Sequence, residues 1–306
     1  MSLMANGVFN IRVPASTSNL GAGFDCFGLA LQLYVTVRAE IVAGGTACCV
    51  ESSGECAGLP KDESNLIYRA MQFAAEREGW VLPPVRLEVN NEIPLSSGLG
   101  SSAAAIVAGV KLAGAVCGRE LSAEAALRYA TEMEGHPDNA AASLRGGFVV
   151  NATDAQGAVT CSKQTWPDEL KIIAVSPHAE LPTKQARAAL PTHYSRAEAV
   201  FNLQRAALFV AALATRDYDA LWTATRDCWH QQYRQKFVPG LTEALALPQS
   251  PGLCGIFLSG AGPTVLALAR DNFAAIGAAI AGCFQREGIA ATTRLLAVDA
   301  PGAQFR

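Results

Sequence analysis

A glycine-rich segment at residues 94–104, PLSSGLGSSAA, restricts the fold of this chain more than any other feature. An alternating run at residues 85–89 precedes it and predicts a strand, and an alanine- and valine-rich run at residues 101–116 predicts a largely buried helix. Gly98 and Gly100 permit backbone conformations that turn N–H groups towards one point, and the helix adds the positive end of its dipole. The segment therefore predicts an anion site, suited to a triphosphate, at the start of the helix.

Ser101 and Ser102 stand at this predicted helix start. One hydroxyl can cap the backbone there, and the other can ligate Mg²⁺ or a phosphate oxygen. The segment lacks the lysine of GxxxxGK[ST] and the pattern GxGxxG, so it is neither a P-loop nor a dinucleotide-binding turn. On its own it is equally compatible with a serine-capped helix start that binds nothing.

Length and composition indicate a self-folding protein of two domains. The chain has 306 residues, of which 50% are hydrophobic and 17% charged, unlike disordered segments. We expect the domains at residues 4–165 and 166–306.

Charge and cysteine patterns exclude several kinds of partner. The formal net charge is −3 and no dense Lys/Arg run occurs, so we expect no nucleic-acid partner. No uninterrupted apolar stretch reaches the roughly 20 residues that span a bilayer, and the N-terminus lacks a secretion signal, so we expect no membrane partner and a cytoplasmic location. The nine cysteines lack CxxC spacing, which predicts packed, reduced thiols rather than a zinc site.

Residue patterns predict interleaved strands and helices. The polar stretch at residues 15–23 predicts a loop after the first strand, and Ser64 is the expected cap of the first helix. A polar hairpin at residues 154–168 separates the halves, and the second half is expected to be α+β with a largely antiparallel sheet. The predicted elements are strand 9–13, strand 29–42, helix 64–78, strand 85–89, helix 101–116, helix 122–134, strand 148–151, strand 170–175, helix 194–214, helix 218–232, strand 255–258, strand 265–269, helix 272–287 and strand 292–298.

Two further segments join the glycine-rich one in a wider resemblance. With residues 14–31 and 258–264, it resembles the three motifs of the superfamily of galactokinase, homoserine kinase, mevalonate kinase and phosphomevalonate kinase, the GHMP kinases. Within that superfamily, the homoserine kinase family is the one that the following segments resemble: VPASTSNLGAGFDCFGLAL at 13–31, EGHPDN at 134–139, PTKQAR at 182–187 and HQQYR at 230–234. One difference is Ser96-Ser97, where some relatives carry a basic residue.

The resemblance implies a two-domain α+β GHMP kinase. Its N-terminal domain would be of the ribosomal protein S5 domain 2-like type and its C-terminal domain ferredoxin-like, with the active site between them. The implied reaction is Mg-ATP-dependent phosphorylation of the L-homoserine hydroxyl to O-phospho-L-homoserine in threonine biosynthesis. A homodimer is compatible with this reading. The alternatives are a related kinase for another small alcohol or phosphate, and a nucleotide sensor without turnover.

The resemblance also implies roles for individual residues. Glu134 and Ser102 would ligate Mg²⁺, and Asp138 would be the general base, if one is used. The carboxylate of homoserine would meet Arg187 and Arg234, because guanidinium groups match carboxylates in two-point geometry. The expected substrate-binding residues are Asn19, Asp25, His136, Thr183, Arg187, Arg234 and Gly260, with Asp25 as the countercharge to the ammonium group. The expected ATP-binding residues are Asn65, Pro94, Leu95, Ser96, Ser97, Gly98, Leu99, Gly100, Ser101, Ser102, Ala103 and Ala104.

Purely structural roles stay open for several of these residues. Asn19 and Asp25 flank a glycine turn that their side chains can stabilise. Asp138 followed by asparagine is also an ordinary turn signal at a helix exit, and the segment 258–264 can be a tight hairpin. Asn65, expected at a helix start, can be structural, and Glu134 at a helix end can simply be solvated.

Overall fold

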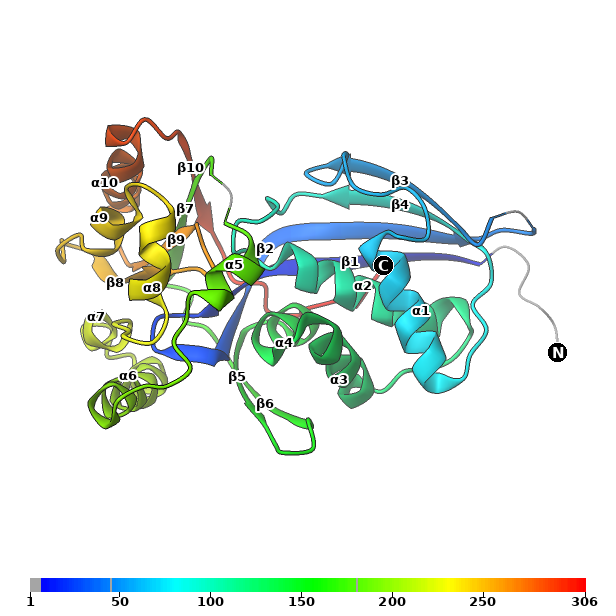
Figure 1. Cartoon of the computed structure of the whole chain (residues 1–306), viewed down its shortest axis with the longest axis horizontal. Coiled ribbons are helices and arrows are strands. Elements are labelled where there is room, and N and C mark those ends of the chain that lie inside the picture. The colour runs from blue at the N-terminus through cyan, green and yellow to red at the C-terminus, as the bar shows by residue number, and fades with distance from the viewer. Residues whose placement is uncertain (1–6, 45, 180) are drawn as a thin grey trace.

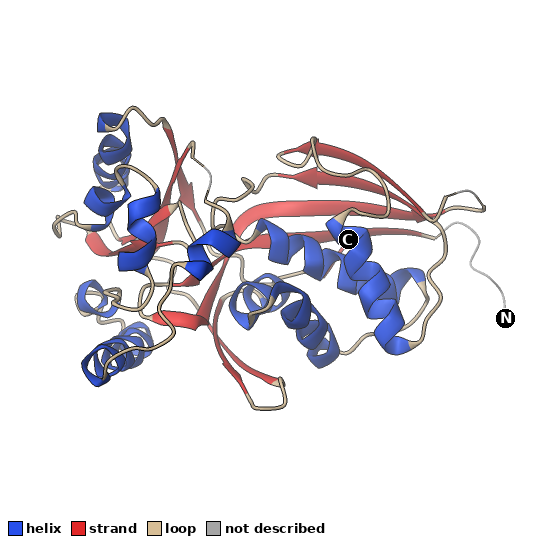
Figure 2. Cartoon of the chain, viewed as in Figure 1, coloured by secondary structure: helices blue, strands red, loops and turns tan. Residues whose placement is uncertain are grey.

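A computed structural model describes residues 7–44, 46–179 and 181–306. The described chain forms two sheets that follow one another along the long axis of the molecule (Figure 1). Helices cover one face of the first sheet and the outer side of the second (Figure 2). Strands and helices are thus mixed in both halves, which confirms the predicted two-domain α+β class.

The first sheet is built on a long antiparallel hairpin of β1 and β2, paired from Val8↔Glu40 to Asn19↔Gly23. The second half of β2 pairs with β4 and the first half with β5, so the hairpin is central. β4 alternates buried and exposed residues, as a strand with one face on the core does. The strands are β1 (Val8–Asn19), β2 (Gly23–Ile41), β3 (Cys48–Gly54), β4 (Val85–Asn91), β5 (Phe148–Thr153), β6 (Val159–Gln164) and β11 (Gln304–Phe305).

Four helices cover one face of this sheet: α1 (Leu66–Glu78), α2 (Ser101–Val116), α3 (Ala123–Glu134) and α4 (Pro137–Arg145). α2 lies centrally, against β1 and against the other three helices, and most of its residues are buried. An alanine-rich sequence suits this place because small side chains let neighbouring backbones approach closely. The start of α2 therefore has a fixed position relative to β1.

The second sheet has the antiparallel order β10-β7-β9-β8. Its strands are β7 (Lys171–Pro177), β8 (Leu253–Leu258), β9 (Val265–Ala269) and β10 (Ala291–Leu296). The helices of this half are α5 (Thr183–Ala188), α6 (Arg196–Thr215), α7 (Leu221–Ala224), α8 (Gln231–Arg234), α9 (Leu241–Leu245) and α10 (Phe273–Arg286), with a 3₁₀ turn, η1, at Gln235–Phe237.

Aromatic side chains connect the two halves. Phe209 of α6 packs on Phe27 of β2 and Phe148 of β5, with ring centroids 5.4 and 5.5 Å apart. Trp166, between β6 and β7, packs on Phe148 at 6.1 Å. The chain end also returns to the first sheet, because β11 pairs with β1. The proposed domain boundary at residues 165/166 falls in the connection between β6 and β7 and stays a prediction.

Several elements differ from the sequence prediction for identifiable reasons. β1 runs through the polar stretch expected as a loop, because Ser16, Thr17 and Ser18 are buried and pair with β2. Asn65 rather than Ser64 caps α1, since Asn65 Oδ1 accepts from the Ile67 N–H at 3.0 Å. The predicted helix at 101–116 and strand at 265–269 are confirmed with the same bounds.

Other differences arise where a side chain redirects the backbone. The helix expected at 218–232 is interrupted between α7 and α8, where the Asp227 carboxylate binds the N–H groups of residues 229–231. Pro137 begins α4 instead of only ending α3, since proline is favoured at a first helical position. The hairpin region 154–168 contains β6, and β3, α4, α5 and α9 have no counterpart among the predicted elements.

Helix α6 is long and apolar enough, by length and composition alone, to cross a bilayer, and among the described residues it is the one such helix. Core helices of soluble proteins meet the same criterion. α6 begins with a capping box of Ser195 and Glu198 and contributes Phe209 to the core. Only 22% of the window that meets this criterion is buried, so α6 packs on the rest of the protein along part of its surface.

Candidate active site

Three segments far apart in the sequence meet between the two sheets. They are the end of β1, the glycine loop (residues 94–100) and the hairpin loop (residues 259–264) between β8 and β9. The Ser16 N–H donates to Leu99 O at 3.1 Å, and the Thr264 N–H donates to Ser97 O at 3.1 Å. The Gly260 N–H donates to Ser18 O at 3.2 Å, so each segment is bonded to the other two.

Two positions of the glycine loop require glycine, both because neighbouring segments approach them closely and because their φ angles are positive. Gly98 has φ +84°, and a Cβ there would lie 2.2 Å from Ser259 O. Gly100 has φ +71°, and a Cβ there would lie 2.2 Å from Ser16 Oγ. Both contacts are far below van der Waals distance, so any larger residue would push the segments apart.

The start of α2 has the properties of an anion site. Gly100 is its N-cap, no side chain caps it, and its first turn contains no acidic residue. The expected serine cap was therefore wrong: Ser101 Oγ accepts from Asn91 Nδ2 at 3.1 Å, and Ser102 Oγ turns to another helix. The N–H groups of the first turn consequently have no side-chain acceptor, and phosphate oxygens can fill that role.

Ser102 and Glu134 bring two oxygens together at the site. Ser102 Oγ donates to Glu134 Oε2 at 2.9 Å, which joins the start of α2 to the end of α3. Burial raises the pKa of the Glu134 carboxyl, against the lowering influence of His136 and of the hydrogen bond from Ser102. Hydroxyl and carboxylate oxygens are hard ligands of the kind that Mg²⁺ takes from proteins. The pair therefore fits a shared Mg²⁺, which would favour the charged carboxylate.

Asp138 lies in the first turn of α4 and not at a helix exit, which corrects the turn interpretation. Its Oδ1 accepts from the Asn139 N–H at 2.7 Å and lies 2.5 Å from His136 Nδ1. Burial alone would lower the pKa of His136, but the hydrogen bond and charge of Asp138 raise it. A carboxylate in the first turn of a helix interacts favourably with the positive end of the helix dipole, and Asp138 has this position in α4.

Asn19 uses its side chain within the protein. Its Oδ1 accepts from the Asp25 N–H at 3.0 Å, and its Nδ2 donates to Gly260 O at 3.1 Å. Asn19 and Asp25 both have positive φ, at 70° and 54°. These contacts favour the structural alternative for Asn19, which holds the turn that presents Asp25.

Asp25 and Arg187 form a two-point ion pair, at 3.0 Å from Nη1 to Oδ2 and 2.8 Å from Nη2 to Oδ1. Arg187 comes from α5 and Asp25 from β2, so the pair links the two halves. About a third of each side chain is exposed, at 38% and 33%, so solvent screens the attraction and both groups stay accessible to a ligand.

Arg234 is 2% exposed and is therefore not a surface arginine, although it lies at the end of a short helix. Its Nη1 donates to Gly260 O at 2.9 Å, and no carboxylate among the described residues lies within ion-pair distance of it. Burial, together with the neighbouring charge of Arg187, lowers the pKa of Arg234 to about 10. A buried guanidinium without an anionic partner is costly, and an anionic ligand would compensate for it.

A pocket of about 160 Å³ gathers most of the predicted residues. Its lining includes Asn19, Asp25, Pro94, Ser96, Ser97, Gly98, Leu99, Gly100, Ser101, Ser102, Glu134, His136, Asp138, Arg187, Arg234 and Gly260. Ala103 and Ala104 are buried in α2. Thr183 begins α5, and its side chain lies outside the described part of the chain.

A second, more apolar pocket of about 350 Å³ adjoins the first, sharing Ser96, Ser101 and Ser102. Leu95 and Asn65 line it. Both ends of the Asn65 amide bond within the protein, since Oδ1 caps α1 by accepting from the Ile67 N–H and Nδ2 donates to Pro60 O at 2.8 Å. This favours the structural alternative for Asn65 while leaving its place beside the pocket intact.

Sequence reasoning missed two polar residues of the first pocket, Ser18 and Asn139. Asn139 Nδ2 donates to Ser18 Oγ at 3.0 Å, and Asn139 Oδ1 accepts from Ser16 Oγ at 3.0 Å. The signal was present, because both residues lie inside motifs that the resemblance identified. Their pairing joins residues more than 120 positions apart and could not be read locally.

Known families match both halves of the chain. The model of the GHMP kinases N terminal domain matches residues 65–147, and that of the GHMP kinases C terminal matches residues 209–284. A homoserine kinase of Deinococcus radiodurans is 46% identical over 264 residues, 84% of this chain and 83% of its own length. One of Solibacter usitatus is 40% identical over 289 residues, 94% of each chain.

Solved structures agree with these matches. The crystal structure of a homoserine kinase from Cytophaga hutchinsonii superposes with a TM-score of 0.86 at 27% identity, covering 100% of this chain and 99% of the other. A mevalonate kinase of L. major has a TM-score of 0.67 at 17% identity, a likeness of fold alone.

The cap of α1 gives a prediction about stability. Asn65→Ala should lower the free energy of unfolding by about 0.5–2 kcal/mol, because the Ile67 N–H loses its acceptor. Ser64→Ala is the matched control and should stay within about 0.5 kcal/mol of wild type, since Ser64 is exposed and loses only a surface hydrogen bond to Asp62. Urea denaturation of the three proteins measures this. Equal losses in both variants would refute the assignment of the cap to Asn65.

Proposed function

The chain belongs to the GHMP kinases and, within them, to the homoserine kinases, and on this premise we propose that it transfers the terminal phosphoryl group of ATP to the hydroxyl of L-homoserine. The kinase class itself, ATP-dependent phosphorylation of a hydroxyl group, follows from the family. The observation that carries the choice of acceptor is the buried Arg234, next to Arg187, without an anionic partner among the described residues.

ATP would extend across both pockets. Its phosphates would lie in the glycine loop, against the uncapped N–H groups of α2. Its base would occupy the adjoining apolar pocket, whose shared residues Ser96, Ser101 and Ser102 connect it to the phosphate end. The 350 Å³ of that pocket is within the usual size of small-molecule sites.

Mg²⁺ would be held by the Ser102 hydroxyl and the Glu134 carboxylate, which are in contact between the start of α2 and the end of α3. Two protein oxygens suffice, because Mg²⁺ usually keeps several waters and takes its remaining ligands from phosphates. When bound, the ion neutralises charge that develops on the phosphoryl group.

A zwitterionic acceptor would match the charges of the site. The ammonium group of the acceptor would lie at Asp25, and its carboxylate would lie at Arg234 and Arg187. The acceptor would thus place one positive and one negative charge beside the Asp25–Arg187 ion pair. His136 and Gly260 also line this pocket and would contact the acceptor. Thr183 stays a proposed contact from the start of α5.

Asp138 would accept the proton of the acceptor hydroxyl if a general base is used. Its carboxylate lines the pocket and is held by His136 and the Asn139 N–H. Phosphoryl transfer depends mainly on positioning and charge neutralisation, so this contribution would be secondary. In a cell the product would serve threonine biosynthesis in the cytoplasm, as the resemblance implied.

An acceptor panel tests the proposed function. Steady-state phosphorylation with Mg-ATP should give a kcat/KM for L-homoserine roughly 10–200-fold above that for L-serine, which is one methylene shorter. L-threonine and mevalonate should also be poor acceptors, the latter because it lacks the ammonium group. A preference for mevalonate would indicate the related-kinase alternative, and ATP binding without any product would indicate the sensor.

Glu134→Gln tests the metal site. The neutral amide should lower kcat by about 100-fold or more while changing ATP affinity far less, because charge stabilisation matters most in the transition state. Glu132→Gln, an exposed neighbour on α3, is the matched control and should retain wild-type turnover. Both are compared across a Mg²⁺ titration. Wild-type turnover of Glu134→Gln at saturating Mg²⁺ would remove Glu134 from the site.

Arg234→Ala tests the carboxylate contact. It should raise KM for homoserine roughly ten- to hundred-fold, because the acceptor would lose a hydrogen bond to a charged group. Arg234→Lys should restore only part of the lost affinity for homoserine, because an ammonium group lacks the two-point geometry of a guanidinium. With 3-aminopropan-1-ol, which lacks the carboxylate, Arg234→Ala and wild type should behave alike. Equal damage with both acceptors would contradict the carboxylate assignment.

A further inference from the structure

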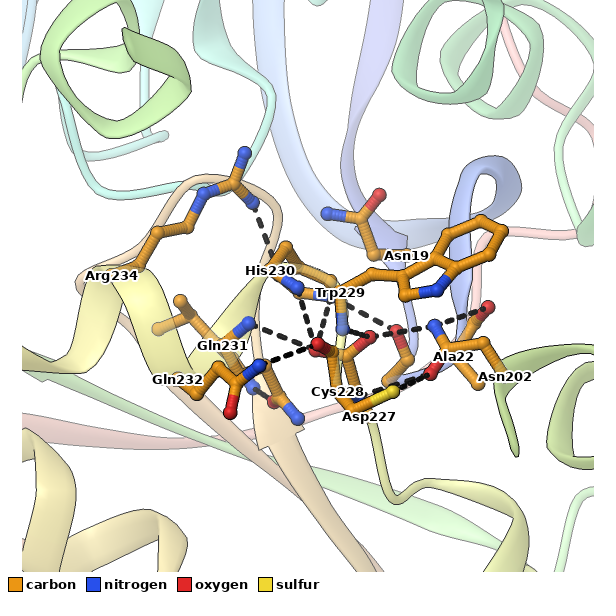
Figure 3. A network of polar contacts seen from close by, with 12 residues as sticks. Asn19, Ala22, Asn202, Asp227, Cys228, Trp229, His230, Gln231, Gln232 and Arg234 are labelled. Atoms are coloured by element: carbon orange, nitrogen blue, oxygen red, sulfur yellow. Dashed lines mark hydrogen bonds and ion pairs between the residues drawn. The ribbon is translucent and has the colours of Figure 1, made fainter. Parts of the chain in front are cut away.

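A buried polar network around Asp227 and His230 reaches Arg234 at its edge (Figure 3). Its central member is His230, the N-cap residue of α8, which is fully buried and lies four positions before Arg234. One turn of helix separates the two residues, so their side chains can meet on the same face. None of the site roles discussed above uses His230.

Asp227 fixes the backbone at His230. Its Oδ1 accepts from Asn202 Nδ2 at 2.8 Å and from the Trp229 N–H at 3.0 Å. Its Oδ2 accepts from the N–H groups of His230 and Gln231, at 2.9 and 2.8 Å. A fully buried carboxylate with this many donors holds the turn before α8 in one conformation.

The imidazole of His230 has a partner on each nitrogen. Nε2 lies 2.9 Å from Gly21 O, and Nδ1 lies 3.1 Å from Arg234 Nη1. A guanidinium group can only donate, so Nδ1 must accept and carries no proton. A carbonyl oxygen can only accept, so the proton lies on Nε2. The contacts therefore require a neutral imidazole with a single tautomer.

The charges around the ring agree with the neutral form. Asp227 Oδ2 lies 3.7 Å from Nε2, which favours a proton there, while the Arg234 guanidinium faces Nδ1 and opposes a second proton. Asp25 adds a weaker negative influence. Burial, the largest cause, lowers the pKa of His230.

His230 also connects Arg234 to the turn between β1 and β2. Gly21 in that turn approaches Thr225 so closely that a Cβ would lie 2.1 Å from Thr225 O, so the turn lies directly on the second half. The Phe24 ring stacks on His230, with centroids 5.5 Å apart, and the Arg234 guanidinium carbon lies 5.6 Å from the same ring. Asp25 follows Phe24 in β2. The same ring and turn thus position Asp25 and Arg234.

We propose that His230 is a positioning residue for the acceptor site: as a neutral acceptor it holds Arg234 at a fixed distance from Asp25 and so sets the spacing between the carboxylate and ammonium subsites. This inference rests on the proposed function. His230 does not line the pocket and acts through Arg234, whose guanidinium also donates to Gly260 O and Ala186 O.

A double-mutant cycle tests the inference. His230→Gln keeps a donor near the position of Nε2 but loses the acceptor at Nδ1, so KM for homoserine should rise about ten-fold with KM for ATP unchanged. His230→Asn keeps an acceptor near Nδ1 and should stay within about three-fold of wild type. In the Arg234→Ala background, His230→Gln should add less than about two-fold, because the group it positions is absent.

The control for the cycle is Gln232→Ala, an exposed change on the same short helix, which should leave KM for homoserine as in wild type. If His230→Gln raises KM for homoserine by the same factor in the wild type and in the Arg234→Ala background, the positioning role is overturned. An equal rise in KM for ATP would also overturn it, since it would indicate general structural damage.

Histidine NMR tests the hydrogen bond without turnover. The chain has four histidines, which can be labelled with ¹⁵N. The His230 signals should report a protonated Nε2 and an unprotonated Nδ1 from pH 5.5 to 8.5. Arg234→Ala should shift the Nδ1 signal. An imidazolium ion or a proton on Nδ1 would refute the inference. Absence of homoserine turnover in the wild type would instead contradict the proposed function, and the NMR result would still decide the His230–Arg234 contact.

Discussion

The close packing of the glycine loop against the end of β1 and the hairpin loop is the constraint on which the site depends. A Cβ on Gly98 or Gly100 would lie 2.2 Å from a neighbouring oxygen, so the three segments touch only because both residues are glycine. This contact joins the two sheets and fixes the start of α2 relative to both. It also leaves the first N–H groups of α2 without a side-chain cap, facing the pocket.

Charges of opposite sign come to the pocket from opposite halves. Asp25, Glu134 and Asp138 belong to β2, α3 and α4 of the first half, whereas Arg187 and Arg234 belong to α5 and α8 of the second. Burial leaves the charges of Asp138 and Arg234 poorly screened by water, whereas solvent screens the partly exposed Asp25 and Arg187. A ligand with both signs of charge can therefore bridge the halves, which agrees with an amino-acid acceptor in a kinase of this family.

Much of the fold could be predicted from local pattern. α2 and β9 have the predicted bounds, because an alanine-rich helix and a short run of buried residues are determined by their own sequence. Prediction failed where a distant partner changed the local preference. Ser16, Thr17 and Ser18 look like a loop but continue β1, since β2 pairs with them and the glycine and hairpin loops bind the backbone of Ser16 and Ser18. The side chain of Asp227 binds the N–H groups of residues 229–231, in a break in a helix that local pattern would have continued.

The sequence by itself determined which chemical groups the site contains: a glycine-rich helix start, hydroxyls, carboxylates and two arginines within recognisable motifs. Only the tertiary structure decided how those groups are used. The side-chain amides of Asn65 and Asn19 form hydrogen bonds within the protein, and the partner of Asn19 is 241 positions away. Arg234 is buried and donates to a neutral histidine that local pattern did not single out. The reason is physical: a motif fixes which donors and acceptors exist, but which are already paired depends on contacts between distant segments that form only when the two halves pack together.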